Sequence, residues 1–124
     1  DFLSGIELFR DLTGDELAQV GTTCTARVYA EGQLVFEENT ARTGLFLIRE
    51  GDVELFKRTP FGDEKRLAHF RPGDFLGEGV LMNEDPHSTS ARAMTRADVL
   101  VLAAGGLVTL LSSQPAIGVK VVGH

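Results

Sequence analysis

Residues 73–90 read GDFLGEGVLMNEDPHSTS, and this stretch interrupts an otherwise regular succession of short β-type runs. Gly77 and Gly79 flank the carboxylate of Glu78, and a turn of apolar residues begins at Val80. Exposed amides followed by a helix N-terminus favour a bound anion, because unpaired N–H groups and the helix dipole both attract negative charge. Glu78 would repel a phosphate but can accept a hydrogen bond from a sugar hydroxyl. The segment is therefore either a site for a sugar–phosphate ligand or a tight turn whose glycines permit positive φ.

On both sides of this segment the hydrophobic pattern has a period of two, which is typical of half-buried strands. Seven or eight strands at near-regular spacing, separated by polar turns, indicate an antiparallel sandwich or roll. We therefore predict a mainly β fold, an eight-stranded antiparallel, jelly-roll-like β-roll flanked by helices at both ends. The β-type runs are Thr25–Ala30, Leu34–Glu37, Leu45–Arg49, Val53–Arg58, Arg66–Arg71, Ser88–Thr95 and Val99–Ala103.

Helices are expected at the two ends of the chain. Thr13 and Glu16 have the spacing of a capping box, which predicts a helix over about 13–22, and a shorter helical piece precedes it. Leucines recur at helical spacing in Gly105–Ser113, and Pro115 either stops this helix or starts another. We expect one domain over residues 1–124. It divides into a helical lead-in (1–24), the β-roll (25–104, with the segment 73–90) and a C-terminal helical segment (105–124) that is truncated.

Composition and charge exclude several classes of protein. The 124 residues suit one domain, and 12 Lys+Arg against 18 Asp+Glu give a net charge of −6, which repels nucleic-acid phosphates and anionic lipid. The longest apolar stretch, residues 99–104, is far shorter than the ~20 residues of a membrane span. Cys24 is the single cysteine, so neither a disulfide nor a cysteine-bound metal is expected. We expect a cytoplasmic domain that binds neither nucleic acid nor membrane by itself.

The residues give no support for catalysis. The three histidines, His69, His87 and His124, are scattered, whereas a metal site of the cupin type needs a close His-x-His pair and further ligands. No nucleophile can be placed beside a histidine and a carboxylate at converging positions. We therefore expect that the chain is not an enzyme and that it needs no metal or cofactor.

The segment at 73–90 resembles the phosphate-binding cassette of the cyclic nucleotide-binding domain family. That family includes relatives of catabolite activator protein, cyclic-nucleotide-dependent kinases and gated channels. The resemblance implies the β-roll, a ribose contact through Glu78, amide contacts at Gly77, Ser88 and Thr89, and a ligand that is cAMP or cGMP. The matching positions are Phe75, Gly77, Glu78, Gly79, Val80, Leu81, Met82, Ser88 and Thr89, with the turn glycines Gly32, Gly51 and Gly73 upstream.

The chain departs from this pattern at His87, where the family places the arginine that clamps the cyclic phosphate. Arginine offers a permanent charge and a planar fork, whereas a neutral histidine offers a single donor. His87 either faces the phosphate or is an exposed loop histidine without a ligand. Arg92 lies five positions further, an odd offset that turns it to the other face of a strand, so we interpret it as an exposed strand residue.

The resemblance implies a ligand-sensing regulatory domain that relays the state of a cyclic nucleotide, or another small anion, to an attached effector. One alternative is a degenerate cassette that binds no nucleotide and serves as an interaction or assembly module. Another is the sensor half of a catabolite-activator-type transcription regulator that lacks its DNA-binding domain. The apolar stripe Leu107, Leu110 and Leu111 is expected to pack either on the roll or on a second copy, and we expect a homodimer formed through the C-terminal helix, in the segment after Pro115.

Overall fold

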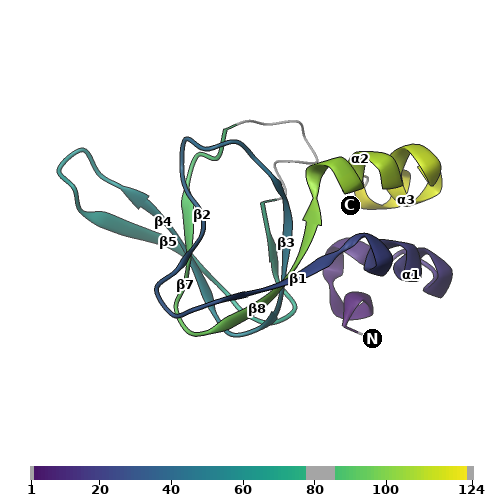
Figure 1. Ribbon diagram of the computed structural model, residues 1–124, viewed down its shortest axis with the longest axis horizontal. Coiled ribbons are helices and arrows are strands. Elements are labelled where there is room, and N and C mark those ends of the chain that lie inside the picture. The colour runs from purple at the N-terminus through teal and green to yellow at the C-terminus, as the bar shows by residue number, and fades with distance from the viewer. Residues whose placement is uncertain (1, 78–85, 123–124) are drawn as a thin grey trace.

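The computed structural model describes residues 2–77 and 86–122. Within these ranges the strands are β1 (Thr25–Tyr29), β2 (Leu34–Phe36), β3 (Gly44–Glu50), β4 (Val53–Arg58), β5 (Glu64–Phe70), β6 (Phe75–Leu76), β7 (Ser90–Ala93) and β8 (Ala97–Ala103). They form two four-stranded antiparallel sheets, in the orders β1-β8-β3-β6 and β2-β7-β4-β5. Figure 1 shows the strands at one end of the molecule and the helices, with both chain ends, at the other. The predicted eight-stranded antiparallel roll is confirmed.

Strand β3 is buried on both faces, because it lies between the second sheet and the helices. Phe46 and Ile48 belong to the apolar cluster between the two sheets. Leu45 and Leu47, on the alternate face, belong to the cluster under the helices. All four side chains are buried, which explains why this strand is continuously apolar instead of alternating.

The helical layer comprises two 3₁₀ turns, η1 (Leu3–Gly5) and η2 (Glu7–Phe9), and three α-helices, α1 (Gly14–Thr23), α2 (Ala104–Ser113) and α3 (Pro115–Val122). The capping box of α1 is confirmed: the Thr13 backbone N–H donates to Glu16 Oε1 (2.8 Å), and the Glu16 N–H donates to Thr13 Oγ1 (3.2 Å). Pro115 begins α3 directly after α2 ends.

The apolar stripe of α2 is covered within the chain itself. Leu107 and Leu110 are buried in one cluster with Leu17 and Val20 of α1 and with Ile117 of α3. The helices at the two ends of the sequence therefore share a core, so these leucines need no second copy to cover them. A charged contact spans the same layer: Lys120 Nζ of α3 donates to Glu16 Oε1 at 2.6 Å.

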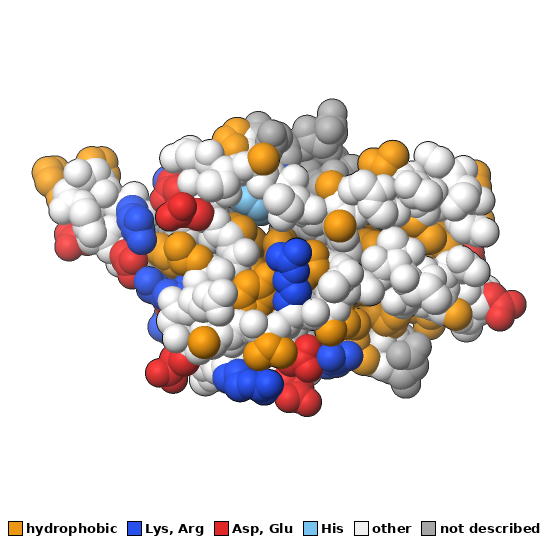
Figure 2. Space-filling view, viewed as in Figure 1, with side chains coloured by type: hydrophobic (Ala, Val, Ile, Leu, Met, Phe, Trp, Pro, Cys, Tyr) orange, Lys and Arg blue, Asp and Glu red, His pale blue; other side chains and the backbone are white. Residues whose placement is uncertain are grey.

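The β4–β5 hairpin projects beyond the rest of the roll, at the end opposite the helices (Figure 1). Its tip carries Phe61, which is 92% exposed. Figure 2 shows that charged side chains of both signs gather over the strands, whereas the helical end is mostly uncharged in this view. Among residues 2–77 and 86–122, no helix has the length and apolar character needed to cross a bilayer.

Candidate functional site

Within the cassette, Gly77 occupies a position that no other residue can take without strain. Gly77 follows β6 and has φ of +83°. A Cβ built on Gly77 would lie 3.0 Å from the carbonyl oxygen of Gly44 and 3.1 Å from the ring of Phe46. Positive φ and close packing on β3 thus both require glycine at this position. The next three predicted site residues, Glu78, Gly79 and Val80, lie outside the described residues.

His87, at the other end of the cassette, is held rigidly. Its backbone N–H donates to the carbonyl of Thr40 (2.9 Å), and its carbonyl accepts from the N–H of Asn39 (2.8 Å). Its ring stacks on Phe36, with 3.9 Å between the ring centroids and 7° between the planes. His87 is only 1% exposed, so the interpretation of an exposed loop histidine is wrong. Its stacking on Phe36 and its pairing with the β2–β3 loop account for this burial.

The side chain that reaches His87 comes from the β2–β3 loop. Arg42 Nη1 lies 3.4 Å from His87 Nδ1, a long hydrogen bond between partly buried groups. A guanidinium can only donate, so Nδ1 acts as the acceptor and the contact fits a neutral imidazole with its proton on Nε2. The guanidinium of Arg42 thus places a permanent positive charge beside the His87 ring.

The polar residues after His87 are tied to neighbouring strands through their backbone or hydroxyl groups. Ser88 is exposed and Thr89 is partly buried. The carbonyl of Ser88 accepts from Lys57 Nζ (3.0 Å), and Ser90 Oγ accepts from the backbone N–H of Glu38 (2.9 Å). These contacts join the end of the cassette to β4 and to the β2–β3 loop. These contacts hold His87 and Ser88 in the same region of the roll. Gly77, the first of the predicted site residues, packs on strand β3.

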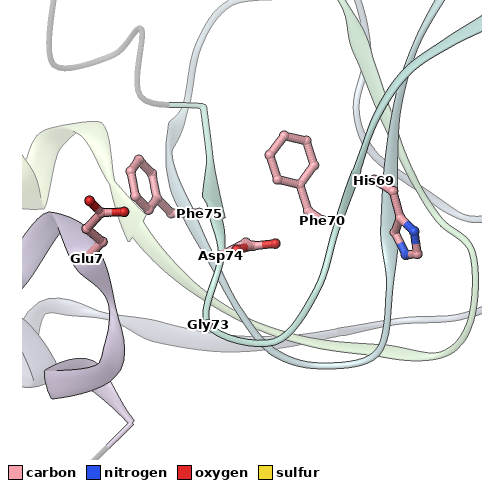
Figure 3. Close-up of a pocket in the computed structure, with 6 residues that line it drawn as sticks. All are labelled: Glu7, His69, Phe70, Gly73, Asp74 and Phe75. Atoms are coloured by element: carbon pink, nitrogen blue, oxygen red, sulfur yellow. The ribbon is translucent and has the colours of Figure 1, made fainter.

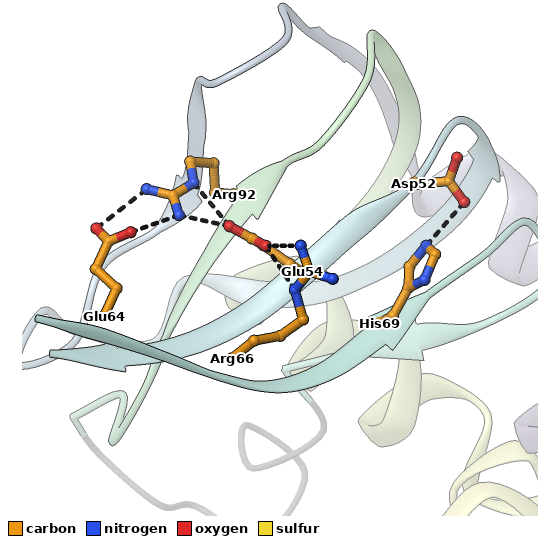
Figure 4. Close-up of polar contacts among 6 residues, drawn as sticks. All are labelled: Asp52, Glu54, Glu64, Arg66, His69 and Arg92. Atoms are coloured by element: carbon orange, nitrogen blue, oxygen red, sulfur yellow. Dashed lines mark hydrogen bonds and ion pairs between the residues drawn. The ribbon is translucent and has the colours of Figure 1, made fainter.

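Arg92 is not the simple exposed strand residue that was expected. Its side chain is 27% exposed and lies in an ionic cluster on β4, β5 and β7, shown in Figure 4. Arg92 Nε donates to Glu54 Oε1 (2.9 Å), and Arg92 Nη2 donates to Glu64 Oε1 (2.7 Å). Arg66 Nε completes the cluster by donating to Glu54 Oε2 (2.9 Å). The guanidinium of Arg92 also lies 4.3 Å from the centroid of the Phe56 ring.

The charges of this cluster stabilise one another. Hydrogen bonds to Glu64 and Glu54 raise the pKa of Arg92 above its usual value. The hydrogen bond from Arg92 lowers the pKa of Glu54, although burial acts in the opposite direction. Because Arg92 is held between two carboxylates, it is poorly suited to bind an anionic ligand. The cluster lines a hollow of ≈ 280 Å³ together with Phe56.

A second hollow lies beside the turn before β6, with a volume of ≈ 380 Å³ (Figure 3). His69 at its edge is exposed, and its Nε2 lies 3.0 Å from Asp52 Oδ1. Asp74 accepts from the backbone N–H of Arg71 (2.7 Å) and so closes the turn. Nowhere in the described part of the chain do three or more His, Cys, Asp or Glu side chains gather as a metal site would require. The lining residues are Glu7, His69, Phe70, Gly73, Asp74 and Phe75.

The single thiol is unsuited to nucleophilic chemistry. Cys24 is partly buried at the end of α1, and burial raises its pKa to about 11. A thiol with so high a pKa carries almost no thiolate at neutral pH.

Sequence reasoning missed Phe36 and Arg42 as neighbours of the cassette. Phe36 was assigned only to a strand, and Arg42 stands in a polar loop 45 positions before His87. No local sequence pattern marks either residue as a neighbour of the cassette. They lie near it only because residues 39–40 pair with the backbone of His87 in the folded chain.

Comparison with known proteins agrees with this geometry. The model of the family described as "Cyclic nucleotide-binding domain" matches residues 26–114. The Cyclic AMP receptor protein of Thermus thermophilus is 29% identical over 113 residues, which are 91% of this chain and 52% of that protein. The cAMP-dependent protein kinase regulatory subunit of Mycosarcoma maydis is 30% identical over 97 residues, 78% of this chain and 18% of that subunit. The chain thus spans about half or less of the length of these two curated relatives.

A solved structure resembles the fold closely over nearly the whole chain. It is the N-terminal domain of a transcriptional regulator from Streptomyces coelicolor A3(2), with a TM-score of 0.90 and 27% identity. The match covers 98% of this chain and 87% of that domain. Since the family model matches most of the sequence and the fold agrees, the chain belongs to the cyclic nucleotide-binding domain family.

Proposed function

We propose that this chain is a sensor domain that binds a cyclic nucleotide at the cassette and passes its ligand state to an attached effector. The family consists of regulatory binding domains and not of enzymes, and both curated relatives are regulators. The observation that carries the proposal is the conformation of Gly77, whose positive φ and packing on β3 suit the cassette turn.

Ligand recognition follows from the chemistry of the cassette residues. In this proposal Glu78 accepts hydrogen bonds from the ribose hydroxyl, and amide groups at Gly77, Ser88 and Thr89 donate to the cyclic phosphate. Gly79 and Val80 belong to the same predicted ligand-binding set. The ligand is cAMP or cGMP. No cofactor is required.

The relay runs through the C-terminal helices. Helices α2 and α3 follow β8 directly and pack against α1 and β3, so a displacement of the roll would move them. The effector is a domain attached to this one, and the receptor protein, the kinase subunit and the transcriptional regulator named above illustrate the classes of protein to which it can belong.

Calorimetry with cAMP and cGMP tests the proposal. Glu78→Ala is expected to weaken binding by about 1.5–3 kcal/mol, the usual value of a hydrogen bond to a charged group. A 2′-deoxy analogue should lose a similar amount with the unmodified protein. Equal affinity of the unmodified protein for the ribo and deoxy ligands would remove Glu78 from the site, and absence of binding by either cyclic nucleotide would overturn the proposed function.

A second candidate function is favoured by the burial of His87. A cassette whose phosphate-clamping position holds a buried, stacked histidine has lost one strong phosphate contact. In that case the domain is an assembly module that binds no nucleotide. The same calorimetry separates the two, because an assembly module gives no heat with cAMP or cGMP while it remains folded.

A further inference from the structure

The backbone carbonyl of Ser88 lies just outside a strand ladder and is held by a lysine side chain. The ladder between β7 and β4 ends at the pair of Ser90 with Phe56. Residues 88–89 precede β7 and therefore lie beyond this last pair. Lys57, the next residue of β4, continues the connection with its side chain, because its Nζ donates to the carbonyl of Ser88 at 3.0 Å.

Glu38 of the β2–β3 loop keeps the ammonium group of Lys57 at this carbonyl. Its Oε2 lies 3.9 Å from Lys57 Nζ, and its Oε1 accepts from the backbone N–H of Arg58 at 3.3 Å. The backbone N–H of Glu38 donates to Ser90 Oγ (2.9 Å). One loop residue thus connects β4 with β7. The side chain of Glu38 is only 20% exposed, so it forms a fixed partner for the more exposed lysine.

The peptide group that Lys57 contacts also contains the N–H of Thr89. A peptide group is planar and trans, so its C=O and its N–H point in opposite directions. The hydrogen bond that fixes the Ser88 carbonyl toward Lys57 therefore turns the Thr89 N–H away from Lys57. A charged donor on the carbonyl also polarises the peptide group, which makes its N–H a stronger hydrogen-bond donor.

On these grounds we infer that Lys57 is a positioning residue of the ligand site, which orients and strengthens the Thr89 amide for the phosphate of the ligand. The inference rests on the proposed function, in which this amide donates to the cyclic phosphate. Lys57 acts through the peptide group and not by touching the ligand. Its removal should therefore affect ligands that carry the phosphate, and it should also alter the Thr89 amide in the protein without ligand.

The test compares two variants of Lys57 with a matched control. Lys57→Met removes the ammonium group but keeps a long unbranched side chain, and Lys57→Arg keeps a charged donor. Lys65→Met removes the same charge from β5, where Lys65 is exposed and pairs with Lys57 across the hairpin. Each protein is titrated by calorimetry with cAMP and with adenosine, which has the base and the ribose but no phosphate. Thermal melting verifies that each variant is folded.

A spectroscopic measurement on the protein without ligand complements the titrations. The amide ¹H and ¹⁵N chemical shifts of Thr89 respond to a hydrogen bond on the carbonyl of the same peptide group. A general loss of charge or of stability does not single out this one amide. The shifts are measured in the unmodified protein and in all three variants.

We expect Lys57→Met to weaken cAMP binding about three- to tenfold, the value of one hydrogen bond, and to leave adenosine binding unchanged. The Thr89 amide should shift in the same variant. Lys57→Arg should restore both the affinity and the shift, and Lys65→Met should match the unmodified protein in both. If adenosine binds too weakly to be measured, the Thr89 shift and the rescue by Lys57→Arg decide.

The possible failures are distinguishable. If the unmodified protein binds cAMP but Lys57→Met changes neither the affinity for cAMP nor the Thr89 shift, the inference is wrong and the proposed function stands. The same holds if Lys65→Met weakens cAMP binding as much as Lys57→Met, because the charge of the hairpin would then be the cause. If the unmodified protein binds no cyclic nucleotide, the proposed function fails and the inference fails with it.

Discussion

Single glycines determine how closely the strands of this roll approach one another. Gly51, in the turn between β3 and β4, has φ of +85°, and a Cβ there would overlap the carbonyl oxygen of Arg96 and lie 2.8 Å from Cα of Ala97. Gly62, at the hairpin tip, has a similar φ of +90° but no atom within 4 Å of such a Cβ. Gly62→Ala should therefore lower the free energy of unfolding by about 1–2 kcal/mol, from backbone strain alone. Gly51→Ala should cost about 1–3 kcal/mol more, from overpacking against backbone that must shift. Urea denaturation of both variants measures the difference, and equal losses would show that the turn at Gly51 relaxes freely.

The same residues show what sequence can and cannot predict. Turn glycines are visible because glycine is the residue that suits positive φ, and Gly32, Gly51, Gly73 and Gly77 all have it. Contacts between residues far apart in the sequence cannot be predicted from the local sequence pattern. Arg42 meets His87 over 45 positions and Arg92 meets Glu54 over 38, and only the folded topology brings them together. The cassette was therefore predictable as a motif, whereas the charged residue beside it was not.

At the level of elements, the ionic cluster joins three strands of one sheet. Arg92 of β7 bridges Glu54 of β4 and Glu64 of β5, and Glu54 is only 8% exposed. Arg92→Gln leaves a buried carboxylate with Arg66 as its cation, and should lower the free energy of unfolding by about 3 kcal/mol at neutral pH. The matched control is Arg58→Gln, an exposed arginine whose Nε lies 3.7 Å from Glu64, and should cost under about 1 kcal/mol.

The pH dependence of this loss has a definite sign. The folded pKa of Glu54 lies below its unfolded value of 4.5, so its ionised form stabilises the fold above that pH. This stability disappears as the pH falls through the folded pKa, and the difference between the unmodified protein and Arg92→Gln should shrink below about pH 4. Urea denaturation at pH 7 and at lower pH measures both effects, because urea is uncharged and does not screen the ion pairs. A difference that stays constant with pH would exclude Glu54 as its source.

The elements themselves were predictable to different degrees. The seven β-type runs correspond to seven strands because each is an alternating or continuously apolar run bounded by turn residues. β6 was missed, since Phe75–Leu76 is too short to show any period and is identified only by its pairing with Phe46 and Leu47 of β3. For α3 the sequence left two alternatives, that Pro115 stops the preceding helix or starts another, because an eight-residue segment without an N-cap signal gives little evidence of a helix.

At the scale of the whole molecule, the two ends of the chain are connected through Glu16. Its Oε1 accepts from the Thr13 N–H within the capping box and from Lys120 Nζ of α3. The hydrogen bond from Lys120, and next that from the Thr13 backbone, lowers the pKa of Glu16. The charge of Glu16 thus supports two contacts. One is the capping box at the start of α1, and the other holds α3 against α1. Both contacts lie in the helix layer through which, in the proposed function, a ligand signal would leave the roll.

Glu16→Gln separates these two contacts, because glutamine keeps the capping box but cannot form the ion pair. In Glu16→Gln we expect faster amide hydrogen exchange in residues 115–122 and unchanged exchange at the start of α1. Lys120→Met removes the other partner of the ion pair and should produce the same pattern. Lys65→Met, at an exposed lysine of the β4–β5 hairpin, is the control for loss of a positive charge and should leave α3 unaffected. Because the folded pKa of Glu16 is lowered, the contact stabilises α3 above the unfolded value of 4.5, and acid should abolish the difference between Glu16→Gln and the unmodified protein. Exchange that is equally slow in all four proteins at neutral pH would mean that the apolar contacts of Ile117, Leu107 and Leu110 hold α3 without help from the ion pair.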